Sequence, residues 1–424
     1  METRELFQAA LGLTPPWQVS DVSFEQDEEA GASQLRLRVA FPRGSRFPCP
    51  ECGKLCSVHD TAEHRWRHLN FFQHHTYLHA RVPRTKCEEH GVVTVPVPWA
   101  REGSGFTLLF EAYLMMMAPE MPMAAIARQL EEHDTRLWRA VQHHVAEARA
   151  AVDMSGVEDL VVDETSRARG QSYVTLFAEP KPSRTRVLFA TRGRSHRTFE
   201  VFARDLREHG GHPSQIRNLC MDMSAGFEKG AEAVMPRARV TLDRFHVMKL
   251  VGEAVDEVRR RERKEHPELK NTRYHWLKNP ENLKVRQREK LATLSLQNLL
   301  TAKAYQMRLN LRALWKEPGV VAARAFLKRW CSWVSRATRR RDPEARRILE
   351  PMARLAKTIR DKAEGIINYF RYGKHLTGGV IEGINSLVQA ARARARGYRN
   401  PSTFITMIYL IAGRLRFDLP AVTH

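Results

Sequence analysis

The stretch Val157-Glu-Asp-Leu-Val-Val-Asp-Glu164 is a short apolar run that ends in two adjacent carboxylates. Its length and composition predict a buried strand. Two later runs repeat the pattern, because Ile216–Met221 is followed by Asp222 and Arg239–Leu242 is followed by Asp243. Acidic side chains at the ends of neighbouring strands lie beside one another. The pattern therefore predicts a sheet with an acidic edge.

Further runs around this stretch complete the predicted sheet. Ser172–Ala178 and Thr185–Ala190 are strand-like, and Thr198–His209 and Ala225–Met235 have helical spacing. Three consecutive strands followed by alternating helix and strand predict a mixed α/β sheet. Residues 245–375 lack strand alternation and carry Arg, Lys, Leu and Ala at helical spacing, which predicts an all-helical block. The fold class is thus α+β, with several domains.

Charge is the unusual feature of the composition. The chain has 424 residues, enough for two to four domains at roughly 100–200 residues each. Its net charge is +21. Residues 1–250 hold 32 basic and 32 acidic side chains, whereas residues 251–424 hold 37 and 16. An excess confined to one half indicates a polyanion-binding surface, although a merely solvated basic surface is the alternative.

Composition also excludes several classes of protein. No stretch of about 18 apolar residues exists, so we expect no membrane span. The N-terminal residues METRELFQ lack the basic start and apolar core of a signal peptide. Cys220 and Cys331 stand alone in the sequence and are expected to be buried thiols. In a chain without a secretion signal, the four remaining cysteines indicate metal before disulfides.

Those four cysteines fall within 39 residues. Cys49-Pro-Glu-Cys52-Gly is a CxxC turn, and Cys87-Glu-Glu-His90-Gly supplies a second pair. Three thiolates and one imidazole predict a closed, tetrahedral Zn²⁺ site with a structural role. Four other side chains are alternative ligands: Cys56, His59, His64 and His68.

A pair of short helices is predicted after the cysteines. Met123–Leu130, a polar break and Arg136–Val145 match a helix-turn-helix in length and apolar spacing. A plain helical hairpin has the same pattern, so packing alone is the alternative. The side chains expected to enter a DNA groove are Arg136, Trp138, Arg139, Gln142 and His143.

A third carboxylate lies far from the first two. Glu382 occurs in Gly378-Gly-Val-Ile-Glu-Gly-Ile-Asn385, which opens a predicted helix. Two Asp and one Glu brought together by a fold are what two-metal phosphoryl transfer needs, because Mg²⁺ prefers oxygen ligands. From the residues alone, Asp243 and Glu164 have equal claims to this role beside Asp163 and Asp222.

A resemblance to a known family decides between these carboxylates. Five motifs occur in order: Val162-Asp163-Glu164, Met221-Asp222-Met223-Ser224, Asp243-Arg-Phe-His-Val247, Glu382-Gly-Ile-Asn385 and Arg396-Gly-Tyr-Arg-Asn400. Together with CPECG at 49–53 and the helical pair, they resemble bacterial insertion-sequence transposases of the ISL-three family. The resemblance implies a ribonuclease-H-like DDE fold with a helical insertion, and a catalytic triad of Asp163, Asp222 and Glu382. It places Asp243 to His246 near the site but outside the triad.

The same resemblance implies ligands and partners. They are two Mg²⁺ (or Mn²⁺) on the triad, one structural Zn²⁺, terminal inverted repeats and target DNA, and a second copy of the chain. No membrane or small-molecule substrate is implied, and the place of action is the nucleoid of a bacterial cytoplasm. The family more often has cysteine at the position of His90 and lysine at that of Gln389. Residues after Glu382 are expected to contact DNA: Asn385, Arg392, Arg394, Arg396 and Arg399.

The resulting organisation has six parts: an N-terminal β segment (1–47), a zinc finger (48–100), a helix-turn-helix (101–150), the first part of the catalytic core (151–245), a basic helical insertion (246–376) and the last part of the core (377–424).

Other features of the basic half have two interpretations. Arg259-Arg-Arg261 and Arg339-Arg-Arg341 suit phosphate oxygens, or else are solvated arginines on helix faces. Trp315, Trp330 and Trp333 fall at helical spacing among Leu and Phe, which favours core packing over base stacking.

Two rival functions stay open at this point. A non-catalytic DNA-binding repressor descended from a transposase needs the finger and the helical pair but not the carboxylates. A ribonuclease-H-like nuclease without strand transfer needs the carboxylates but joins no DNA ends.

Overall fold

The structure is a computed structural model of the chain, and it describes residues 2–26, 33–168, 170, 172–181, 185–339, 342–372 and 379–422, with only the backbone of Gln26 and Val380. The chain forms two compact units, Met1–Ala148 with Arg416–His424, and Arg149–Leu415.

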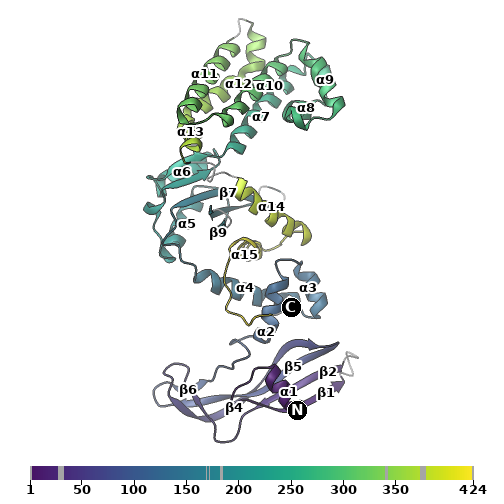
Figure 1. Cartoon of the computed structure of the whole chain (residues 1–424), viewed down its shortest axis with the longest axis vertical. Helices are drawn as coiled ribbons and strands as arrows, with labels where there is room; N and C mark the ends of the chain where they lie inside the picture. Colours follow the sequence, from purple (N-terminus) through teal and green to yellow (C-terminus); the bar gives the residue numbers. More distant parts are fainter. Residues whose placement is uncertain are drawn as a thin grey trace. The chain divides into compact units, whose positions relative to one another are not determined.

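The first unit is built on one sheet, labelled in Figure 1. Its strands follow the order β1-β2-β5-β4-β3, with β6 paired to β5. β2 and β5 are parallel and the other pairs are antiparallel. The elements are α1 (Thr3–Ala10), β1 (Gln18–Gln26), β2 (Ser33–Ala40), β3 (Arg46–Pro48), β4 (Leu55–Phe71), β5 (His74–Cys87) and β6 (Gly91–Thr94).

This sheet differs from the expected N-terminal β segment in two ways. Residues 1–47 include the helix α1, whose Phe7 packs on the core beneath the sheet. The long strands β4 and β5 of the zinc-finger region belong to the same sheet, because β5 pairs with β2 on one side and with β4 on the other. Apolar and basic residues alternate along β2, and its inward residues Leu35 and Leu37 are buried.

Three helices follow the sheet in the first unit. α2 (Leu108–Met117), α3 (Met123–Leu130) and α4 (Asp134–Ala150) form the helix-turn-helix region. The predicted helix 123–130 is confirmed residue for residue. It ends because Glu131 adopts a left-handed conformation, with φ of 51°.

The second unit contains the predicted mixed sheet. Its strand order is β11-β10-β7-β8-β9, with β7, β10 and β11 parallel and β8 and β9 antiparallel. The elements are β7 (Asp159–Ala168), β8 (Ser172–Glu179), β9 (Arg186–Arg192), α5 (Arg197–Glu208), a 3₁₀ turn (Pro213–Gln215), β10 (Asn218–Met221), α6 (Ala225–Val234) and β11 (Arg239–Leu242).

The expectation that Asp163 closes a strand was wrong. β7 continues to Ala168 because its second half pairs with β8 in an antiparallel hairpin. The parallel pairing with β10 stops at Val161 and Cys220. Asp163 therefore lies within a strand, at the point where β7 leaves its parallel partner, whereas Asp222 directly follows β10 as expected.

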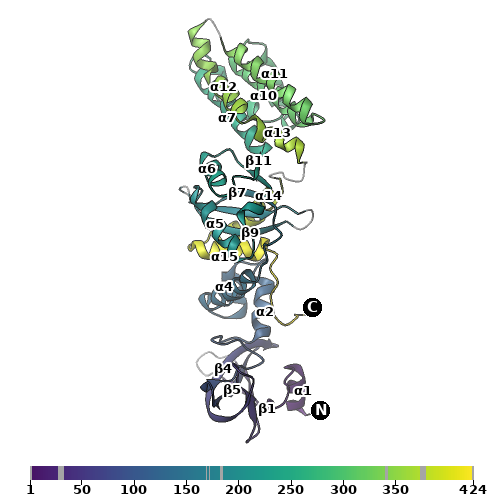
Figure 2. The same ribbon diagram turned by 90° about the vertical axis from the view of Figure 1, so that its left-hand side faces the viewer.

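The predicted all-helical block is confirmed. Helices α7, α10, α11 and α12 pack side by side around one core, and α13 packs against β11 (Figures 1 and 2). The elements are α7 (Arg244–Glu262), α8 (Arg273–Leu277), α9 (Val285–Ser295), α10 (Leu300–Arg312), α11 (Val320–Thr338), α12 (Pro343–Asp361), α13 (Ala363–Arg371) and 3₁₀ turns at Pro267–Leu269, Pro280–Asn282 and Ala313–Lys316.

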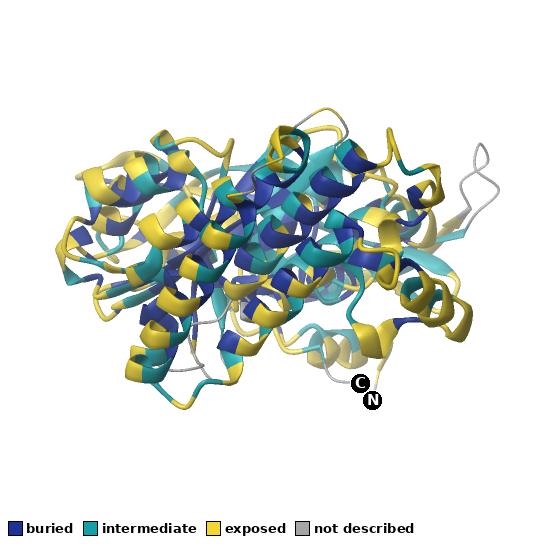
Figure 3. Cartoon of the chain, turned by 90° about the horizontal axis from the view of Figure 1, so that it is seen from above, coloured by how far each residue is buried: buried dark blue, intermediate teal, exposed yellow. Residues whose placement is uncertain are grey.

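Two helices return to the mixed sheet after the insertion. α14 (Gly379–Arg394) and α15 (Pro401–Ala412) cover one sheet face. Ile381, Ile384 and Val388, at helical spacing, pack against Val161 and Leu176. In Figure 3, buried residues recur along one side of many helices, as this packing requires. No helix within the described ranges combines the length and apolar character that crossing a membrane requires.

Candidate functional site

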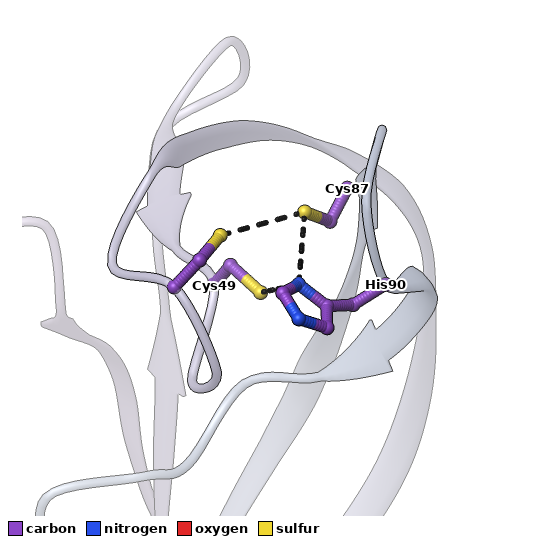
Figure 4. Close-up of side chains that lie close together, drawn as sticks. Cys49, Cys87 and His90 are labelled. Carbon is purple, nitrogen blue, oxygen red and sulfur yellow. Dashed lines mark hydrogen bonds between the residues drawn. The ribbon is translucent and has the colours of Figure 1, made fainter.

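The cysteine cluster forms a compact group of four ligand atoms. Those of Cys49, Cys52, Cys87 and His90 all lie within 4.8 Å of one another. His90 Nδ1 is 3.8 Å from Cys49 Sγ and 3.6 Å from Cys87 Sγ, and Cys52 Sγ is 3.7 Å from Cys87 Sγ (Figure 4). Ligands of a tetrahedral zinc ion are separated by about 3.8 Å (S to S) and about 3.6 Å (S to N), given the usual bond lengths. The donor set therefore fits Zn²⁺.

The chemistry of Cys87 supports the same conclusion. Hydrogen bonds from the His90 backbone and side chain lower the pKa of Cys87 to about 6. The thiolate is the form that binds metal, and it prevails at neutral pH when the pKa lies there. Gly53, which ends the CxxC turn, has φ of 73°, a conformation that glycine adopts without strain.

The alternative ligands lie outside this group. Cys56 is buried beside Cys49 and Cys87, but its thiol donates to the backbone oxygen of Lys54 at 3.3 Å. His68 Nδ1 is 2.8 Å from Thr107 Oγ1. His59 and His64 do not belong to the group of ligand atoms either.

The acidic edge of the second unit follows from strand register. Cys220 lies opposite Val161, so two residues further Asp222 is level with Asp163. Alternate residues of a strand share a face, and Val161 and Cys220 pack beneath α14. Asp163 thus faces α14, whereas Glu164 points to the other face, where Arg194 Nη1 lies 3.8 Å from its carboxylate.

Asp163 carries the strongest electrostatic signature of this edge. Burial, together with the nearby Asp243 and Asp222, raises the pKa of Asp163 to about 6, although the Glu164 amide and His246 act in the opposite direction. Its Oδ1 accepts a hydrogen bond from the Glu164 amide at 2.8 Å. Burial and like charges in one place destabilise an apoprotein, so a cation is the natural counterpart of this edge.

Asp243 and His246 lie beside these carboxylates, as the resemblance implied. Asp243 caps α7 by accepting a hydrogen bond from the amide of Phe245 at 3.0 Å. His246 Nδ1 lies 3.1 Å from Asp243 Oδ2, and this contact, with the nearby Asp163, raises the pKa of His246. A protonated His246 offsets part of the acidic charge.

Helix α14 is fastened to β7 by a line of polar contacts. Asn385 Nδ2 donates to Asp163 Oδ2 at 2.7 Å, and Gln389 Nε2 donates to Thr165 Oγ1 at 2.8 Å. Glu382 precedes Asn385 by three residues and so lies on the same side of α14, one turn nearer its N-terminus. It is exposed. In the described part of the chain, the carboxylate oxygens of Asp163, Asp222 and Glu382 do not all lie within 4.8 Å of one another.

An arginine-lined cavity of about 650 Å³ lies at the far end of the same helix. Arg392 and Arg396 come from α14 and the turn that follows it, and Arg399 comes from the segment before α15. Arg167, which the sequence analysis did not single out, joins them from β7. Its Nη1 donates to the backbone oxygens of Tyr398 and Arg399 at 3.1 and 3.2 Å. Arg394 does not line this cavity.

The helix-turn-helix residues divide into two groups. Arg136 is anchored although its side chain is 42% exposed, because its Nη1 is 2.5 Å from Glu132 Oε2 and its guanidinium lies 4.5 Å from the centre of the Phe106 ring. His144 is buried against Glu111 at 2.7 Å. The outer side of α4 carries Arg139, Gln142 and His143, of which Gln142 is partly buried.

The remaining candidates mostly brace the insertion. Arg259 is buried and pairs with Asp256 at 2.8 Å, and Arg261 pairs with Glu257 at 2.6 Å. Arg259 and Arg261 are therefore not part of an open phosphate-binding cluster, whereas Arg260 keeps 60% of its side chain exposed. Arg339 is exposed, but Arg340 and Arg341 lie outside the described residues. Trp330 is buried, and Trp315 and Trp333 pack on the same core, as predicted. The lone Cys220 and Cys331 are both buried.

Comparison with known proteins identifies the class. Residues 45–90 match the zinc-finger of transposases IS204/IS1001/IS1096/IS1165, residues 95–145 match the helix-turn-helix domain of transposase family ISL3, and residues 160–408 match the DDE transposase model of that family. Domains in this order define a DDE transposase. Because the last match covers more than half of the chain, the chain belongs to the ISL-three (ISL3) family.

Two relatives match along most of their length. The transposase for insertion sequence element IS1557 of Mycobacterium tuberculosis is 26% identical, over 99% of this chain and 98% of the relative. The transposase for insertion sequence element IS1001 of Bordetella parapertussis is 27% identical, over 87% and 89%.

We predict that the purified chain holds one zinc ion. Cys87→Ser and His90→Ala should lose it, because each removes one of four donors, whereas Cys56→Ser should keep it. His90→Cys should also keep it, since thiolate replaces imidazole in such sites. Metal analysis of the purified variants measures this directly. Loss of zinc in Cys56→Ser, with retention in Cys87→Ser, would contradict the ligand assignment.

Proposed function

We propose that this chain is the active transposase of an insertion sequence. It binds the terminal inverted repeats, cuts the element ends and joins their 3′-hydroxyls to target DNA. The observation that carries the proposal is that Asp163 on β7 is level with Asp222, which directly follows the parallel strand β10, beneath the Glu382 helix in a chain of the ISL3 family.

Asp163, Asp222 and Glu382 are the proposed ligands of two Mg²⁺ or Mn²⁺ ions. When bound, such ions activate the attacking oxygen and stabilise the leaving oxygen of a phosphodiester. The oxygen-only donor set suits hard cations. Asn385 has a positioning role, because its hydrogen bond fixes Asp163 Oδ2 and couples α14 to the metal-binding edge.

The accumulated acidic charge favours this enzyme over a non-catalytic repressor. Asp163, Asp222 and Asp243 lie close enough to raise the pKa of Asp163, which destabilises the fold without a cation. A DNA-binding protein that performs no chemistry gains nothing from that cost. A nuclease without strand transfer shares the edge, and the joined product of a strand-transfer assay distinguishes it.

DNA contacts are proposed at two places. In the first unit, Arg139, Gln142 and His143 on the outer side of α4 read base edges, while Arg136 positions the helix through Glu132. In the second unit, the arginine-lined cavity holds phosphate through Arg167, Arg392, Arg396 and Arg399. Arg394, which is exposed on the same helix outside the cavity, is proposed as a further phosphate contact, and Asn385 is proposed to meet DNA at the acidic edge, where it holds Asp163.

Two further properties follow from the proposed reaction. An element has two ends that must be cut and joined together, so a homodimer is proposed. The substrates are chromosomal, which places the protein on the bacterial nucleoid.

We predict that Asp163→Asn, Asp222→Asn and Glu382→Gln each reduce DNA cleavage by more than about 10³-fold, because each removes a metal ligand. Glu164→Gln is the matched control, since this neighbouring carboxylate faces the other side of the sheet. Cleavage and strand transfer are both measured on a labelled duplex that carries the ends of the element, in the presence of Mg²⁺. Equal losses in Glu164→Gln and Asp163→Asn would refute the assignment.

We predict that Asp163→Asn stabilises the metal-free protein at pH 8. The folded-state pKa of Asp163, about 6, lies above the usual value near 3.9, so stability falls as the pH rises between them. The gain should be about 2–3 kcal/mol at pH 8 and vanish below about pH 4. Denaturation in EDTA measures it. Added Mg²⁺ should stabilise the wild type and leave the stability of Asp163→Asn unchanged. Stabilisation of Asp163→Asn by Mg²⁺, with no effect on the wild type, would overturn the metal assignment.

We predict that Arg396→Ala/Arg399→Ala weakens DNA binding with little dependence on sequence. Each lost phosphate contact should lower the slope of log K against log salt by about 0.9. Arg204→Ala/Arg237→Ala is the charge-matched control, because both side chains are exposed on the same unit but away from the cavity. Fluorescence anisotropy over a salt series measures the slopes, and equal slopes in the two double variants would exclude the cavity from DNA binding.

A further inference from the structure

One face of the N-terminal sheet carries a set of basic side chains that the proposed function leaves unused. We call it the basic sheet face: Arg36 and Arg38 of β2, His79 and Arg81 of β5, and Arg65 of β4. Register places Arg38, His79 and Arg65 in one row across three strands. The intervening residues Leu35, Leu37, Leu78 and Ala80 are buried in the core on the other face. The arginines therefore project together from one surface.

The charges on this face are only partly compensated. Arg36 pairs with Glu25 at 2.6 Å, Asp21 lies opposite Arg38 in the register, and Glu63 lies opposite Arg81. Arg38 and Arg81 form no ion pair with any residue that the structure describes, and both line a groove of about 300 Å³ together with His79. Burial lowers the pKa of His79, and Arg36 and Arg65 lower it further, so this side chain is neutral at pH 7. The face keeps a positive balance.

The basic sheet face is joined to the helix-turn-helix. In the next row, Arg67 lies opposite Tyr77, and its Nε is 3.7 Å from Glu132 in the turn between α3 and α4. His75 Nε2 is 2.8 Å from Glu131 in the same turn. The Arg67 amide also donates to the backbone oxygen of Gly105 at 2.8 Å, just before α2. The face and α4 therefore belong to one rigid support within the first unit.

We propose that the basic sheet face binds the phosphate backbone of duplex DNA that flanks the site read by α4. This inference rests on the proposed function, in which α4 contacts DNA. Exposed guanidinium groups on a sheet are complementary to phosphate, and their contacts add affinity that is independent of sequence.

Geometry decides against other forms of nucleic-acid contact. Three to four strands at about 4.8 Å spacing, with their side chains, are wider than the major groove of about 12 Å. The sheet therefore cannot enter the groove to read bases. The ring of Tyr77, the aromatic side chain of this face, is already in contact with the guanidinium groups of Arg65 and Arg67, at 4.7 and 5.4 Å from its centre. A base cannot stack there without displacing them, which argues against a single-strand platform.

The test compares two charge-matched double variants of the full chain. Arg38→Gln/Arg65→Gln removes two charges from the face. Arg4→Gln/Lys86→Gln removes two exposed charges elsewhere, one of them on α1, which packs beneath the sheet. The probe is a fluorescein-labelled random-sequence duplex, about four helical turns long. Anisotropy gives Kd between about 50 and 200 mM salt. Zinc content and the thermal midpoint verify that both variants fold.

The face variant should lower the slope of log K against log salt by about 1.8. Its affinity deficit relative to the wild type should therefore shrink by roughly tenfold as the salt rises over this range. The control should follow the wild type. A face variant that also follows the wild type overturns this inference. It leaves the proposed function intact, provided that Arg396→Ala/Arg399→Ala, measured in parallel on the same duplex, weakens binding. A wild type that binds no duplex overturns both proposals.

Discussion

The hydrogen bond from Asn385 to Asp163 joins residues 222 positions apart in the sequence, and the catalytic half depends on it. Around it, Ile381, Ile384 and Val388 bury one stripe of α14 on the sheet, while Gln389 and Arg392 continue the polar line along β7. Because α14 docks through its own side chains, the helical insertion need not hold it in place. A large block can thus interrupt the core between β11 and α14 without displacing the Glu382 helix from the acidic edge.

The distribution of charge takes a different meaning in the structure. The excess of 21 positive charges lies in residues 251–424, yet some of these basic side chains make contacts inside the protein. Arg259 is buried beside Asp256, and Arg308 is buried and donates to the backbone oxygen of Leu277. Net charge therefore overstates the phosphate-binding capacity of the insertion. Conversely, the neutral N-terminal half hides a basic surface, because strand alternation sorts its arginines onto one face and its apolar residues onto the other.

Periodicity in the sequence predicted most of the architecture, since alternation and helical spacing report which face of an element is buried. The boundaries of α3 and the succession of strands and helices along the chain in the mixed sheet are examples. The course of β7 beyond Asp163 was not predictable, because it depends on hairpin pairing with β8, which no local pattern encodes. Glu382, Asn385, Gln389 and Arg392 follow one another at helical spacing in the sequence. This pattern could have predicted that Gln389 makes a structural contact. Arg167 had no such signal, because its partners are backbone oxygens 231 and 232 residues away.

The two proposed DNA surfaces of the first unit have different physical demands. A helix that reads bases must be held at a fixed depth and angle in the groove, because hydrogen bonds to base edges tolerate little displacement. A flat face of guanidinium groups imposes no such precision on its phosphate partners, so it supplies affinity and register. The contacts of Arg67 and His75 with the turn before α4 fix the relation between the two surfaces. A phosphate contact made by the sheet therefore restricts where α4 lies along the duplex, which converts a sequence-independent interaction into a constraint on sequence recognition.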